Sequence, residues 1–208
     1  SLQRRVPLCD IGERLSRLEI NGIAFDADGD LDHRVVNRAG RQVMGVTEYD
    51  KASPDCVLVS VNGPMLEGND ALLRSTIAHE IGHLVFDAPG WILIPPDAPV
   101  RSGFDLMKNR RDPREVRANE LMGALLVPPW LFRVDWQRQA KQHRFPASGR
   151  PSTVLSGAPA YDGTSLEAEA VEEAIFTLAE RYAVSQSFIQ VRLERYDLLR
   201  GHRAWSGL

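Results

Sequence analysis

Two histidines four residues apart, His79 and His83, lie in the stretch STIAHEIGHLVF, with Glu80 directly after the first histidine. The apolar residues around them recur at the three- and four-residue spacing of one helix face: Leu73, Ile77, Ile81 and Leu84. This pattern predicts an amphipathic helix from about Asp70, its N-cap, to Phe86. Because residues four apart share one face of a helix, both imidazoles can reach a single metal ion.

Glu80 gives this pair of histidines a chemical use. It lies one position from His79, so it does not fully share the histidine face, but it can reach water beside a metal ion and take up its proton as a general base. Gly82, between the histidines, would let a neighbouring element approach the metal-binding face. The alternative is that the pattern arose by chance and that both histidines are half-buried helix residues.

A third metal ligand is needed, because a catalytic zinc ion has three protein ligands and one open position. The next predicted helix, residues 112–127, offers Glu115 and Glu120, whereas the other histidines lie in turns or polar, irregular segments. Glu115 shares a face with Asn119, whose amide can accept the second ring N–H of a ligand histidine. Glu115 is therefore the preferred ligand, and Asp87 is a weaker candidate.

Glu115 also has a purely structural interpretation. Asp112, Pro113 and Glu115 occupy positions that suit an N-cap, the first helical residue and the third, which is a variant of the capping box. In that case its carboxylate would only cap its own helix.

The segments RSTIAHEIGHLV and EVRANELMGALLVP together resemble the ImmA/IrrE family of zinc-dependent metallopeptidases. The first block matches the family pattern Thr-x-Ala-His-Glu-x-Gly-His, and the second matches Glu-x-x-Ala-Asn followed by Leu-Leu-x-Pro. Leu121 and Met122 stand where the family usually has Phe-Ala, a departure that concerns core packing rather than metal chemistry. The resemblance covers roughly residues 20–200.

The resemblance implies a gluzincin-like fold with one zinc ion held by His79, His83 and Glu115, and with Glu80 as general base. Manganese and iron use similar ligands and are alternatives to zinc. It also implies a protein substrate, a helix-turn-helix repressor. Cleavage of that repressor would relieve repression of phage, mobile-element or stress-response genes.

Three short segments before the metal-binding helix are typical of strands: residues 22–28, 41–50 and 55–63. Strands with short connections tend to pair antiparallel. We therefore expect an α+β fold in which a small antiparallel sheet of about three strands packs on helices. This zincin-like metallopeptidase domain would occupy residues 1–150. Residues 151–208 would form a linker and a helical, helix-turn-helix-like C-terminal segment.

Residues 56–63 are a candidate edge strand for an extended peptide substrate, and the side chains concerned are Val57, Val59 and Val61. The alternative is an ordinary strand paired on both sides. Peptide hydrolysis also needs a donor for the charge that develops on the carbonyl oxygen. The candidates for that donor are Tyr161, His143 and Arg117.

The C-terminal segment raises a second hypothesis, a regulator that binds DNA or sequesters a repressor without proteolysis. Acidic residues outnumber basic ones from Tyr161 onward, and the formal net charge of the chain is −3, whereas DNA-binding surfaces are basic. Direct DNA binding is therefore not expected.

The two cysteines, Cys9 and Cys56, form neither a CxxC pair nor a framework of the secreted kind. No apolar run approaches the roughly 20 residues that a membrane helix requires. We therefore expect a cytoplasmic protein without a membrane contact.

Overall fold

The computed structural model describes residues 17–30, 34–37, 40–49, 53, 55–93, 112–164 and 166–201. The described residues divide into two compact units, one up to Met122 and one from Gly123 onward. The division falls inside helix α5 (Pro113–Leu126), whereas the sequence led us to expect a boundary near residue 150. None of the described helices is both long enough and apolar enough to cross a membrane.

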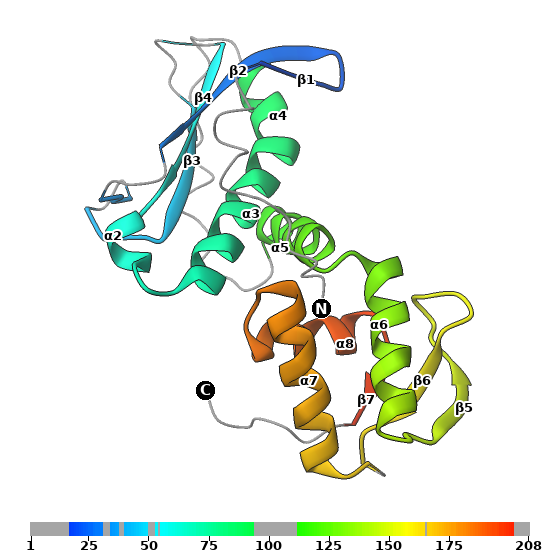
Figure 1. The fold of residues 1–208 in the computed structure, drawn as a ribbon. Helices are drawn as coiled ribbons and strands as arrows, with labels where there is room; N and C mark the ends of the chain where they lie inside the picture. The colour runs from blue at the N-terminus through cyan, green and yellow to red at the C-terminus, as the bar shows by residue number, and fades with distance from the viewer. Residues whose placement is uncertain are drawn as a thin grey trace. The chain divides into compact units, whose positions relative to one another are not determined.

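The first unit contains a four-stranded mixed sheet in the order β1-β2-β4-β3 (Figure 1). Its strands are β1 (Leu18–Ile20), β2 (Ile23–Asp30), β3 (Gly45–Tyr49) and β4 (Cys56–Val61). β1 pairs antiparallel with β2, and β3 pairs antiparallel with β4, but β2 and β4 are parallel. The α+β class is confirmed. The sheet differs from the expected one because β3 lies outside β4, which leaves β2 and β4 as neighbours that run in the same direction.

β4 is an inner strand, so the prediction that it forms the edge of the sheet is wrong. β2 pairs with one side of it and β3 with the other. Val57, Val59 and Val61 are buried, with at most 4% of any of them exposed. They are core residues, and among the described strands it is β3 that ends the sheet on this side.

Three helices follow β4: α2 (Gly63–Leu66), α3 (Asp70–Phe86) and α4 (Ala88–Ile92). α3 begins at Asp70 itself, and its N-cap is Asn69, one residue before the expected cap: the Asn69 side chain accepts a hydrogen bond from the Leu72 N–H at 3.0 Å. α3 packs against β3 and β4. The core between sheet and helices is built from Phe25, Ala27, Val57, Val59, Leu84 and Ala88. This packing fixes one face of α3 on the sheet and sets the rotation of its histidines.

The second unit contains α6 (Pro129–Gln142), α7 (Ala168–Tyr182) and α8 (Gln186–Arg195), together with a small sheet in the order β5-β6-β7 (Figure 1). Its strands are β5 (Ala147–Pro151), β6 (Pro159–Asp162) and β7 (Leu199–Arg200). β5 and β6 replace the linker that the sequence led us to expect. The reason is long-range: β6 pairs with β7, which lies beyond both α7 and α8 in the chain.

α7 and α8 form a pair joined by a short turn, as the helix-turn-helix-like rhythm predicts. Ala183 ends α7 with φ of 53°, and the Ser185 hydroxyl accepts a hydrogen bond from the Phe188 N–H at the start of α8. The exposed side of α7 carries Glu169, Glu172, Glu173 and Glu180. These negative charges oppose contact with a phosphate backbone.

Candidate metal centre

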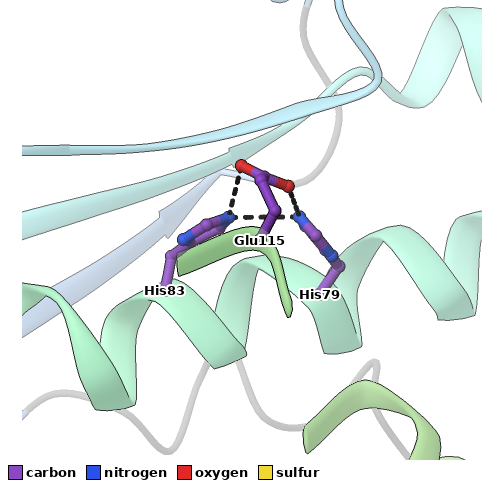
Figure 2. Close-up of side chains that lie close together, drawn as sticks. All are labelled: His79, His83 and Glu115. Atoms are coloured by element: carbon purple, nitrogen blue, oxygen red, sulfur yellow. Dashed lines mark hydrogen bonds and ion pairs between the residues drawn. The ribbon is translucent and has the colours of Figure 1, made fainter. Parts of the chain in front are cut away.

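His79, His83 and Glu115 converge at one point of the first unit (Figure 2). The Nε2 atoms of the two histidines, one turn apart on α3, are 3.1 Å from each other. The Glu115 carboxylate, in the first turn of α5, lies 3.2 Å from His79 Nε2 and 3.5 Å from His83 Nε2. Two helices thus supply three potential ligand atoms to one point.

These separations fit a zinc ion. Ligands about 2.0–2.1 Å from a tetrahedral metal ion lie about 3.3 Å from one another. The two Nε2 atoms are 3.1 Å apart, and each lies close to that separation from one carboxylate oxygen of Glu115, His79 at 3.2 Å from Oε2 and His83 at 3.5 Å from Oε1. Two imidazole nitrogens and one carboxylate also match the donor set of a catalytic zinc site, which keeps its fourth position open. Half of the Glu115 side chain is exposed, so its carboxylate is in contact with solvent.

The far nitrogen of each imidazole is also hydrogen-bonded. Asn119 Oδ1 lies 3.2 Å from His79 Nδ1, and Asp87 Oδ2 lies 2.8 Å from His83 Nδ1. Because both oxygens only accept, Nδ1 is the donor in each pair, and a ring in its neutral form would direct the Nε2 lone pair at Glu115. Two lone pairs and a carboxylate that face one another repel unless a cation lies between them.

The electrostatics of the cluster favour a positive charge at this point. Burial opposes a charge on His83, but its hydrogen bonds with Asp87 and Glu115 outweigh burial and raise the pKa of His83 to about 9. Hydrogen bonds with His79 and His83 lower the pKa of Glu115 well below its ordinary value. The raised pKa of His83 favours a proton on its imidazole at neutral pH, and a metal ion would have to displace that proton.

Glu80 is buried beside the cluster, with 6% of it exposed. Its carboxylate Oε2 accepts a hydrogen bond from the Thr47 hydroxyl on β3 at 2.9 Å. A Cβ added at Gly45, two residues earlier on β3, would lie 2.9 Å from Glu80 Oε1, so a larger residue there would have to displace the Glu80 side chain. Burial raises the pKa of Glu80, and the Thr47 hydrogen bond and the nearby histidines offset only part of that rise. Edge strand β3 thus holds the glutamate in one orientation.

Gly82 allows α3 and α5 to approach closely. A Cβ added at Gly82 would lie 2.6 Å from the Ala118 Cα and 3.0 Å from the Ala118 carbonyl oxygen. Ala118 is almost fully buried and lies one turn after Glu115. The glycine between the two histidines therefore lets α5 bring Glu115 within reach of them.

The structure places the sequence candidates as follows. Glu115 faces the histidines, and the start of α5 is capped instead by Asp112, whose side chain accepts a hydrogen bond from the Arg114 N–H at 2.9 Å. Asp87 lies behind His83 rather than among the ligand atoms, and Arg117 donates to Asp87 Oδ1 at 3.0 Å. Glu120 is not part of the ligand group found among the described residues.

Two further candidates for the charge-stabilising donor, Tyr161 and His143, belong to the second unit. His143 stacks on Phe145, and the Tyr161 ring contacts Trp136 and Phe145. Sequence reasoning missed the contact between Thr47 and Glu80, for which no local signal exists. It also missed the role of Asp87 as the partner of His83, although their spacing of four helical residues was visible.

The family model described as the IrrE N-terminal-like domain, Peptidase M78, matches residues 72–194, more than half of the chain. The match spans α3 and α5, with all of the residues of the ligand group, and continues through α7 into α8. Comparisons with curated proteins and with solved structures gave no match. The matched segment holds the possible metal-ligand group of this chain, which together with the peptidase name of the model points to a metallopeptidase, and the chain belongs to the IrrE N-terminal-like family.

Proposed function

We propose that the protein is a zinc-dependent endopeptidase that cleaves a helix-turn-helix repressor and so relieves repression of phage, mobile-element or stress-response genes. The observation that carries the enzymatic part is the convergence of His79, His83 and Glu115 beside the buried Glu80. A structural site would need a fourth protein ligand, whereas the described residues bring three to this point, which is the number that a catalytic zinc site uses.

In this proposal, His79, His83 and Glu115 hold the metal ion. A bound zinc ion supplies Lewis acidity, which polarises the scissile carbonyl and makes water acidic near neutral pH. Glu80 takes up the proton of the attacking water and passes it to the leaving amine nitrogen. Its raised pKa suits this role, because a base that retains the proton can deliver it in the next step.

We propose that the peptide substrate binds along the outer edge of β3 rather than along β4. An extended peptide can add to an exposed strand through main-chain hydrogen bonds. Among the described strands β3 pairs only with β4, and two of its residues, Gly45 and Thr47, contact Glu80. A peptide on this edge would lie next to the general base.

The repressor as substrate rests on the family resemblance and on the cytoplasmic setting that we propose with it. Cys56 carries a free thiol, which suits a reducing compartment. A regulator that sequesters a repressor without cutting it is the second candidate. The acidic exposed side of α7 disfavours direct DNA binding.

A substrate-trapping experiment tests the proposal. Glu80→Gln preserves shape and should keep the metal while it removes the base. Wild type, Glu80→Gln and the control Glu67→Gln, whose residue is exposed at the end of α2, would be loaded with zinc and used to capture proteins from host cytosol. We expect Glu80→Gln to retain a repressor that wild type and Glu67→Gln cut. A retained repressor that zinc-loaded wild type leaves whole would support sequestration instead, and retention of DNA alone would support the DNA-binding hypothesis.

A further inference from the structure

The two histidines differ in the group that supports them from behind. His79 faces the neutral amide of Asn119 at 3.2 Å, whereas His83 faces the carboxylate of Asp87 at the shorter distance of 2.8 Å. The Asp87 side chain is 4% exposed. A charged acceptor forms the stronger hydrogen bond and increases the basicity of the imidazole on its other side.

Asp87 is bound at both carboxylate oxygens. Oδ2 accepts from His83 Nδ1, and Oδ1 accepts from Nη2 of Arg117 at 3.0 Å. A buried carboxylate is tolerated when its charge is paired and its oxygens are hydrogen-bonded, and these two partners meet that condition. The structure thus joins α5 to the end of α3 by a chain of contacts from Arg117 through Asp87 to His83.

The backbone of Asp87 has a separate task. Its N–H donates to the His83 carbonyl at the end of α3, and its own carbonyl accepts from Gly90 and Trp91 in α4. These main-chain bonds do not depend on the carboxylate. A change confined to the side chain therefore leaves the junction of α3 and α4 intact and alters only the contacts with His83 and Arg117.

We propose that Asp87 is a positioning residue that fixes the ring orientation and tautomer of His83, that Arg117 holds Asp87 in place, and that this pair sets the zinc affinity of the site. Asp87 cannot be a ligand at the same time, because the His83 ring lies between its carboxylate and the ligand atoms. The inference rests on zinc binding at this site, a part of the proposed function, and not on proteolysis.

The test is the zinc dissociation constant, measured by competition with a chromophoric chelator. Partners of this kind change metal affinity by about 10- to 100-fold. We expect Asp87→Asn, which keeps an acceptor but loses the charge, to bind zinc about tenfold more weakly, and Asp87→Ala more weakly still. Asp70→Asn on the exposed first turn of the same helix makes the same chemical change away from the site, and it should bind as wild type does.

Arg117 provides the second arm, because its side chain is about half exposed and its loss should not prevent folding. Arg117→Met should weaken zinc binding in the wild-type background and have no further effect in Asp87→Asn, since the two residues act as one unit. Arg114→Met, on the same helix, is the matched control. Additive losses, or an Arg117→Met variant that binds zinc as tightly as wild type, would overturn the assignment of Arg117.

The charge itself is tested by moving it. Asn119→Asp places a carboxylate behind His79, and in the Asp87→Asn background it should restore a large part of the lost affinity. No recovery in that double variant, or an Asp87→Asn variant within twofold of wild type, would refute the proposal. The apo variants would be compared by circular dichroism so that affinity is compared between folded proteins. Failure of the substrate trap would leave this ranking of zinc affinities unchanged, so the two proposals fail separately.

Discussion

Replacing Gly82 by alanine should separate the two helices that build the metal centre. The new Cβ would lie 2.6 Å from the Ala118 Cα, whereas carbon atoms in contact lie about 3.5–4.0 Å apart. Because the obstacle is backbone, no side-chain rotation relieves it. α5 must move away by about 1 Å, and Glu115, one turn earlier on α5, moves with it.

The expected size of the effect follows from two opposed contributions. Overpacking of this kind destabilises a core by about 1–3 kcal/mol, while alanine in place of glycine favours a helix by about 1 kcal/mol. We therefore expect a loss of folding stability of about 0–2 kcal/mol. Metal–ligand distances tolerate only about 0.2 Å, so a movement of Glu115 by about 1 Å should weaken zinc binding by at least about tenfold.

Zinc competition and thermal unfolding would be measured on Gly82→Ala and on Gly90→Ala. Gly90 is an exposed residue of α4, and a Cβ there meets nothing within 4 Å, so this control makes the same substitution in a helix without the clash. Gly90→Ala should bind zinc as wild type does. If Gly82→Ala binds zinc equally well and unfolds at the wild-type temperature, the close approach of α3 and α5 is not what positions Glu115.

Four further predictions concern the same unit. Thr47→Val should slow substrate cleavage about tenfold, because Glu80 loses the hydroxyl that orients it. The zinc affinity of this variant should stay within about twofold of wild type. A fall in zinc affinity instead would show that Thr47 acts on the metal ligands. Zinc affinity should increase between pH 7 and 9, by up to about tenfold per pH unit, because the metal displaces the proton from His83, whose pKa is raised to about 9. Zinc affinity that does not change with pH in chelator buffers would exclude this displacement. Protonation of His83 should also contribute to the free energy of unfolding of the apo protein. This contribution should be fully present below pH 6.5 and be lost as pH rises through about 9, which thermal unfolding across this range measures. When free zinc is present at about 100 times the dissociation constant of the site, its removal should lower the free energy of unfolding by about 2.7 kcal/mol. An unchanged melting temperature after removal would show that the site does not bind the ion.

The features that could be predicted from the sequence are those carried by a single helix. His79 and His83 depend only on helical spacing, and α3 ends at Phe86 as expected. Glu115 and Asn119 are likewise four residues apart on one helix, so their common face was predictable once the family blocks linked α5 to α3. Local spacing was sufficient because the helix itself fixes the geometry.

The features that could not be predicted depend on pairings between distant segments. The contact of Thr47 with Glu80 requires β3 to pair beside β4 and to lie against α3, but a strand pattern does not state which neighbour it takes. The apolar run of β4 was compatible with an edge or an inner strand, and only the parallel partner β2 decides between them. The same reason explains why β6, paired with the distant β7, looked like linker.

The origin of the three ligand atoms has a consequence for folding as well as for chemistry. His79 and His83 come from α3 and Glu115 from α5, so one zinc ion would tie together two helices that are separated along the chain. The ion would hold the start of α5 against α3 in the folded state, and it would stabilise that state because the unfolded chain has no preformed site. Removal of zinc by a chelator should therefore first increase amide hydrogen exchange in the opening turns of α5, before any change in the sheet. The bound metal would then stabilise the same helix packing that forms its binding site.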